Sequence, residues 1–101
     1  MTVVLPFASA AGVKVNTPVE EMAGCDLLLY QAGADPHIAD PLGGWLTTDE
    51  LRERDRRVFR AACARGLRVV WNLAGGYQKP LRKVLDIHDN TARECVAAWA
   101  E

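Results

Sequence analysis

The stretch that decides the fold is CDLLLYQAGADPHIADPLGGWL, residues 25–46, in which an apolar run passes directly into a loop rich in glycine and acidic residues. The segment from Asp26 to Gln31 has four consecutive apolar residues at its centre, which predicts a strand buried on both faces. The loop that follows carries Asp35, His37 and Asp40. We therefore expect a buried strand with the candidate chemistry at its carboxyl end.

The residues after this loop predict a helix with clear end signals. Thr47 and Glu50 form a capping box, in which each side chain accepts a hydrogen bond from the other residue's backbone N–H. The helix is expected to run to about Arg65, with Gly66 as its left-handed stop. Asp55 falls on the apolar stripe of this helix, and because a lone buried carboxylate is costly we expect it to pair with an arginine or a backbone donor. The apolar members of that stripe are Leu51, Val58, Phe59 and Ala62.

A second strand and a second helix follow. Residues 67–73 (LRVVWNL) predict the strand, which passes into the loop LAGGYQ at 73–78, and a helix is expected from Pro80 to Ala100. His88 lies on the buried stripe of that helix, where a histidine is more often a core residue than a metal ligand. The other residues of the expected stripe are Leu81, Val84, Leu85, Ala92, Cys95, Val96 and Trp99.

The order of elements predicts an α/β fold, a parallel β-α-β-α unit with a right-handed crossover. In such sheets ligands bind at the carboxyl ends of the strands. Both glycine-containing loops leave from those ends, so we expect Asp35 and Tyr77 to line one crevice if the two strands are neighbours.

Composition is that of one globular domain of a soluble protein: 101 residues, 50% hydrophobic, 25% charged and a net charge of -1. A near-neutral chain offers no basic surface for nucleic acid. The apolar residues 2–13 are too few to span a membrane. The three cysteines are odd in number and far apart, which argues against a disulfide framework and favours a reducing, cytoplasmic setting: Cys25, Cys63 and Cys95.

The first 24 residues give weaker signals. Val3 to Phe7 could form a strand, and Pro6 within it indicates a position at the edge of the sheet. Thr17 and Glu20 bracket a proline at the first helical position, which predicts a short helix ending near Gly24.

The loop after the first strand admits two interpretations. Asp35 and His37, two residues apart, could share a zinc or other divalent ion, with Asp40 as a third ligand. Alternatively, Asp40 caps a turn before Pro41 and His37 is merely exposed. The second loop matches neither a P-loop nor a dinucleotide-binding fingerprint.

Two segments carry a resemblance to a known family. YQAGADPHIADPLGGWLTTDELRERDRRVF and, further on, WNLAGGYQKPLRKVLDIHDNT resemble the C-terminal part of the zinc-dependent histone deacetylase superfamily, and most closely its bacterial and class IV branch. The resemblance covers residues 26–99. It implies a portion of the arginase/deacetylase-like three-layer α/β/α fold, with residues 25–101 as the C-terminal part of a deacetylase domain and residues 1–24 as an unmatched segment.

The resemblance implies roles for particular residues. Asp35 would be one of three zinc ligands, and the phenol of Tyr77 would point at the substrate carbonyl. Gly75 and Gly76 would allow the tight turn that brings this tyrosine over the metal, and Leu42 would help to form the rim of the acyl-lysine channel. The family's own Asp-x-His ligand pair lies on an earlier strand, so the resemblance makes the pair formed with His37 a coincidental look-alike.

The sequence departs from the family by what it does not contain. The tandem histidines and the Asp-x-His zinc-ligand pair have no counterpart upstream of Cys25. One carboxylate cannot hold zinc tightly, so we expect the chain to be inactive without a partner that supplies the N-terminal part of the domain. The implied substrates are acetylated lysine or polyamine-type amides. The alternative is a non-catalytic remnant or a small binding module on the same scaffold.

Overall fold

The structure is a computed structural model that describes residues 2–5 and 24–100. The elements in these residues are β1 (Thr2–Leu5), β2 (Leu27–Gly33), α2 (Thr48–Ala64), β3 (Arg68–Ala74) and α3 (Arg82–Trp99). The short helix expected to begin at Thr17 lies outside the described residues, and so does part of the expected strand at Val3 to Phe7. No helix in the described part of the chain has both the length and the apolar character needed to cross a membrane.

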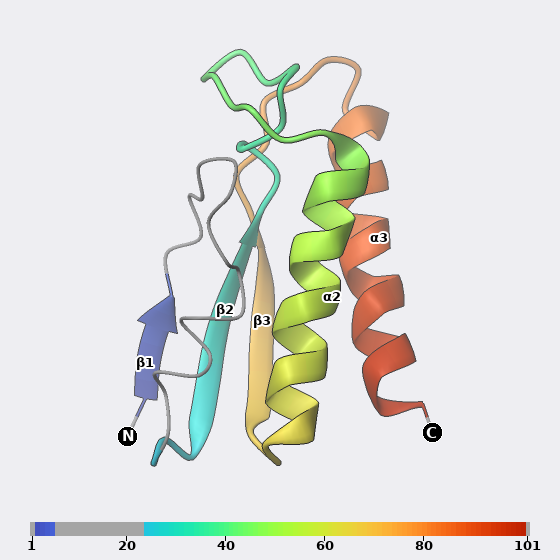
Figure 1. Cartoon of the computed structure of the whole chain (residues 1–101). Coiled ribbons are helices and arrows are strands. Elements are labelled where there is room, and N and C mark those ends of the chain that lie inside the picture. Colours follow the sequence, from blue (N-terminus) through green and yellow to red (C-terminus); the bar gives the residue numbers. More distant parts are fainter. Residues whose placement is uncertain (1, 6–23, 101) are drawn as a thin grey trace.

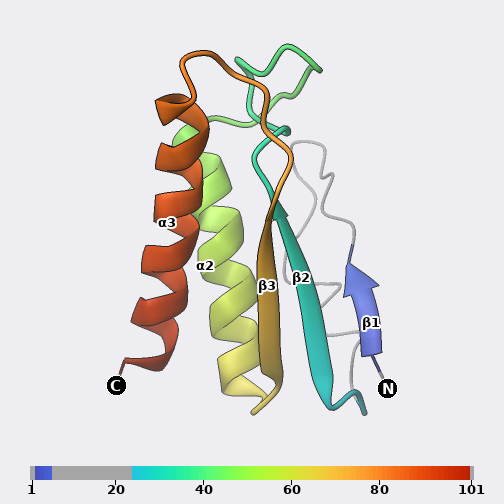
Figure 2. The ribbon, with the colours of Figure 1, turned by 180° about the vertical axis from the view of Figure 1, so that it is seen from behind.

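The sheet has the order β1-β2-β3, and both neighbouring pairs are parallel. Leu29 is paired with Val70 and Tyr30 with Trp71, so the strands that flank α2 lie side by side. Helices α2 and α3 cover the same face of the sheet, and the loops that follow β2 and β3 meet at one end of it (Figures 1 and 2). The predicted parallel β-α-β-α unit is confirmed, and the described residues form two of the layers of an α/β fold.

The core lies between the sheet and the helices. Leu28, Tyr30 and Ala32 point from β2 toward α2, where they pack against Val58 and Phe59. The ring of Phe59 meets Tyr30 edge-on at 5.6 Å and Trp99 at 5.9 Å between centroids. Such edge-to-face pairs add about 0.5–1.5 kcal/mol to the burial of the rings.

The prediction of a strand buried on both faces is wrong for the described residues. Along β2 burial alternates, with Leu29 only half-buried and Gln31 exposed. On the neighbouring strand Val70 is 56% exposed. The physical reason is that the described helices cover only one face of the sheet, so the apolar residues of the other face stay accessible.

Helix α2 begins and ends as the sequence predicts. Thr47 and Glu50 make both hydrogen bonds of the capping box, at 3.0 and 3.1 Å. After α2 the chain turns through Gly66, whose φ of 65° is the left-handed conformation that favours glycine. The predicted apolar stripe is confirmed, because all of its members are buried.

The buried face of α3 differs from the expected one. Leu81 precedes the helix and is 64% exposed, and Val96 is exposed as well. The buried residues of α3 are Val84, Ile87, His88, Thr91 and Glu94. The predicted stripe is wrong in part because it omits two buried polar residues, Thr91 and Glu94, and they can be buried because α2 supplies their partners.

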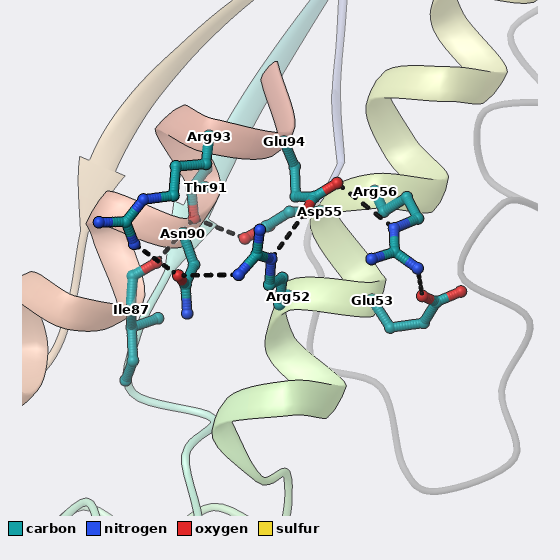
Figure 3. A network of polar contacts seen from close by, with 9 residues as sticks. All are labelled: Arg52, Glu53, Asp55, Arg56, Ile87, Asn90, Thr91, Arg93 and Glu94. Atoms are coloured by element: carbon teal, nitrogen blue, oxygen red, sulfur yellow. Dashed lines mark hydrogen bonds and ion pairs between the residues drawn. The ribbon is translucent and has the colours of Figure 1, made fainter. Parts of the chain in front are cut away.

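Those partners form a polar network between the two helices (Figure 3). Arg52 and Arg56 both reach Glu94, at 2.7 and 3.3 Å from their Nε atoms. Burial raises the pKa of Glu94, but the two guanidinium groups outweigh it and lower the pKa below the ordinary value of 4.5. The hydroxyl of Thr91 donates to Oδ2 of Asp55 at 2.5 Å. The helices are therefore held together by charged contacts as well as by apolar packing.

Candidate active site

The site is built from the two loops that follow β2 and β3. The amide of Ala34 donates to the carbonyl of Ala74 at 3.0 Å, which continues the pairing of the strands into the start of both loops. The loops then lie next to each other at the same end of the sheet in both views (Figures 1 and 2). The topology thus brings residues 34–47 and 75–81 together, as expected for the carboxyl ends of parallel strands.

Asp35 lies between the ends of the two strands. It is half-buried, and its carboxylate lies against two glycines, one on each strand end. A Cβ atom at Gly33 would come within 2.8 Å of Oδ1 of Asp35, and one at Gly75 would overlap the carboxylate. Because glycine has no side chain, these two positions leave room for the carboxylate.

Tyr77 follows two glycines that come directly after β3. Gly75 and Gly76 have φ angles of 57° and 104°, a region that side-chain-bearing residues rarely adopt. A Cβ at Gly76 would lie 2.6 Å from Val84, so this segment packs closely against α3. The side chain of Tyr77 is 53% exposed.

A hollow of about 450 Å³ lies beside Tyr77. Its other lining residues are Ala39, Pro41, Gln78, Lys79 and Lys83. Asp35 does not line this hollow but lies against Gly75, two residues before the tyrosine. The structure therefore brings Asp35 and Tyr77 to one edge of the sheet, on adjoining loops.

His37 has a structural role in the first loop. Its Nδ1 accepts a hydrogen bond from the amide of Ala39 at 3.0 Å, so Nε2 carries the proton of the neutral ring and donates to Oγ1 of Thr48 at 2.8 Å. Both ring nitrogens are engaged, and the histidine ties the loop to the first turn of α2. The interpretation that it is merely exposed is wrong, since it is half-buried.

Asp40 caps the turn that follows it, as one of the two interpretations predicted. Its Oδ1 accepts a hydrogen bond from the amide of Leu42 at 2.9 Å. The side chain of Leu42 is 67% exposed. The described residues bring together no group of three His, Cys, Asp or Glu side chains that could hold a metal ion. The three-ligand interpretation of the first loop therefore finds no support in its geometry.

A buried charge pair, Arg54 and Asp55, lies next to the end of β2, where the first loop begins. Asp55 is fully buried, and Oδ1 accepts hydrogen bonds from Arg54 and from the hydroxyl of Tyr30, which confirms that it pairs with an arginine. Burial, reinforced by this carboxylate and opposed by the guanidinium, raises the pKa of Tyr30 well above 10.0, so the phenol stays a donor. Arg54 also donates to the carbonyl of Gly33 at 2.7 Å, two residues before Asp35.

His88 is buried beneath the second loop. Burial lowers its pKa below the ordinary 6.5, and Arg54 acts in the same direction, whereas the hydrogen-bonding carbonyl of Gly75 opposes the shift. Its Nδ1 is buried and makes no hydrogen bond to the described residues. The expectation that His88 belongs to the core is confirmed.

Three features of the site were not found from the sequence. Arg54 is only 1% exposed, although its neighbour Asp55 gave a signal for a buried partner. The burial of Thr91 depends on its bond to Asp55, and Asp40 accepts a hydrogen bond from the amide of Tyr77 in the second loop. In both cases the two residues are more than 30 positions apart. No local pattern in the sequence reports such contacts.

Comparison with known proteins finds a matching family model and similar relatives. The family model described as the histone deacetylase domain matches residues 10–92, a range that begins upstream of β2. Histone deacetylase 2 of Arabidopsis thaliana is 35% identical over 71 residues, which are 68% of this chain and 18% of that protein. An uncharacterized protein of a Picosynechococcus species is 36% identical over 64 residues, 62% of this chain and 21% of that protein. The chain thus spans about a fifth of the length of these relatives.

Proposed function

The chain belongs to the histone deacetylase family, and we propose on this premise that it supplies one wall of a zinc-dependent deacetylase site. The reaction would be hydrolysis of N-acetyl-lysine or a related acylamide. Asp35 would be one zinc ligand, and the phenol of Tyr77 would donate a hydrogen bond to the substrate carbonyl. The observation that supports this most is their placement on adjoining loops at the carboxyl ends of β2 and β3.

The surroundings of Asp35 suit a metal ligand. Its carboxylate is half-buried and occupies the space left by Gly33 and Gly75, and carboxylate oxygen is an accepted zinc ligand. A bound zinc ion would polarise the acyl carbonyl and lower the pKa of a water molecule beside it. Zinc sites use three or four protein ligands, so the remaining ligands would come from segments other than those described here.

Tyr77 suits the role of hydrogen-bond donor to the substrate carbonyl. Attack of water on an amide carbonyl builds negative charge on the carbonyl oxygen, and a hydrogen-bond donor fixed at that position stabilises the charge. The side chain of Tyr77 is 53% exposed, so its hydroxyl would be accessible to a substrate held at the ends of the two strands. Leu42, exposed on the adjoining loop, would form part of the rim of the substrate channel.

A complete site of this kind needs a general base and further zinc ligands besides Asp35. The 101 residues contain two histidines, His37 and His88, so they include no tandem pair to act as a general base. His37 is hydrogen-bonded to Ala39 in its loop and to Thr48 in α2, and His88 lies in the core. We propose that these residues alone neither retain zinc nor deacetylate. Val70 and Leu73 on β3 are exposed apolar residues against which an N-terminal part of the domain could pack.

The experiment is a reconstitution. The purified chain is mixed with a separately produced N-terminal deacetylase part that contains the tandem histidines and the Asp-x-His pair. Bound zinc and acetate released from an acetyl-lysine peptide are then measured. The proposal predicts that the mixture exceeds both pieces alone in both quantities, and that Asp35→Asn loses the zinc while Asp49→Asn, on the exposed first turn of α2, does not. No gain on mixing would contradict the proposal and favour a non-catalytic binding module.

A further inference from the structure

Asp40 joins the two loops of the candidate site through both of its carboxylate oxygens. Oδ1 accepts a hydrogen bond from the amide of Leu42 at 2.9 Å, and Oδ2 accepts one from the amide of Tyr77 at 2.8 Å. The side chain is only 5% exposed. A carboxylate at such a depth is stable only when its oxygens are hydrogen-bonded, and bonds to a charged acceptor are stronger than neutral ones.

The hydrogen bond to Asp40 joins the backbone of Tyr77 to the first loop. The two preceding residues are glycines with φ angles of 57° and 104°, so the chain enters the tyrosine through its most permissive backbone. The ring is half-exposed and is not held by burial. The bond from its amide to Asp40 fixes the peptide plane from which the side chain departs.

We propose that Asp40 is a positioning residue for Tyr77. One carboxylate oxygen fixes the backbone amide of Tyr77 and so the direction of its phenol. The other fixes the backbone amide of Leu42, so the position of the hydrogen-bond donor is coupled to that of the expected channel rim. The inference rests on the proposed function for the role of the phenol. It does not rest on it for the anchoring itself, which is a property of this chain.

The anchoring is tested first on the whole chain by amide hydrogen exchange measured by NMR. In Asp40→Ala, exchange at Tyr77 and Leu42 should accelerate about ten-fold or more, because each amide loses a bond to a charged acceptor. Exchange at Val70, in the β2–β3 pairing, should stay as in the wild type. The matched control is Asp49→Asn, which removes an acidic charge outside these loops.

Asp40→Asn gives a sharper version of the same test, and it serves if the alanine variant fails to fold. Asparagine keeps one acceptor oxygen and replaces the other with a donor. One of the two amides should therefore keep its slow exchange while the other accelerates. Unchanged exchange at both amides in either folded variant would overturn the proposal.

The effect of Asp40 on the role of Tyr77 in catalysis is tested in the reconstituted enzyme. Asp40→Ala should lower kcat about ten-fold or more while KM and bound zinc change little, because the tyrosine is misplaced but the metal ligand is not. Asp40→Asn should have the same effect only if exchange at the Tyr77 amide accelerates in that variant. In a Tyr77→Phe background Asp40→Ala should cause no further loss, since Asp40 acts through the missing hydroxyl. Wild-type kcat in Asp40→Ala, or in an Asp40→Asn protein whose Tyr77 amide exchanges faster, would overturn the positioning role and leave the proposed function standing. So would a full additional loss in the double variant. An inactive wild-type mixture would count against the proposed function alone, and the exchange data would still decide the anchoring.

Discussion

Gly75 lies so close to Asp35 that a methyl group at position 75 would overlap the carboxylate. The two residues belong to different strand ends, and their contact makes the glycine part of the site that holds the proposed metal ligand. Its φ of 57° adds a second reason for glycine at this position.

Gly75→Ala should therefore destabilise the fold by more than backbone strain alone. Strain in the left-handed region costs about 1–2 kcal/mol, and displacing the carboxylate should add roughly 1–3 kcal/mol. Gly66→Ala is the matched control, because its φ is 65° and, its chain neighbours aside, no atom of the described residues lies within 4 Å of the added Cβ. The free energies of unfolding are compared by urea denaturation. Equal losses at the two positions would show that Asp35 is not packed against Gly75.

The buried charge pair under the first loop should be a main determinant of stability. Asp55→Ala leaves the guanidinium of Arg54 buried without its partner, which should cost about 3–5 kcal/mol. Thr91→Val removes one neutral donor from the same carboxylate and should cost about 1 kcal/mol. Asp86→Ala, in an exposed pair with Arg82, should change the stability little, because solvent screens the pair. A cost at Asp55 no larger than that at Asp86 would refute this assignment.

The buried His88 should make the fold less stable in mild acid. Its pKa is lowered in the folded chain, so the unfolded chain takes up the proton first as the pH falls through about 6.5. The unfolding free energy should then decline by at most about 1.4 kcal/mol per pH unit, down to the lowered folded-state pKa. His88→Gln should flatten this dependence between pH 7.5 and 5.5. His37 is present in both proteins and drops out of the comparison. An unchanged slope in the variant would contradict a depressed pKa.

The sequence predicted those parts of the fold that depend on local signals. The capping box at Thr47, the glycine stop at Gly66 and the two apolar strands gave the order of elements, and the order gave the parallel pairing. The same topology placed Asp35 and Tyr77 on adjoining loops. Each of these inferences uses residues within one element or the rule that connects consecutive elements.

Contacts between distant residues were not predictable in the same way. The buried face of α3 includes Thr91 and Glu94, which are polar and look like surface residues until α2 supplies Asp55 and the arginines. Asp40 gave a local signal for a turn cap, and that was confirmed. Its second hydrogen bond, to an amide 37 residues away, has no local signal, and it is the contact on which the position of Tyr77 depends.

Asp35 and Tyr77 are proposed to act together as a metal ligand and an oxyanion donor. The most direct measurement is bound zinc and acetate release for Tyr77→Phe in the reconstituted enzyme. Removing only the hydroxyl should lower acetate release about 10²–10³-fold while the zinc content stays at the wild-type level. Loss of zinc in this variant, or wild-type acetate release, would contradict the account.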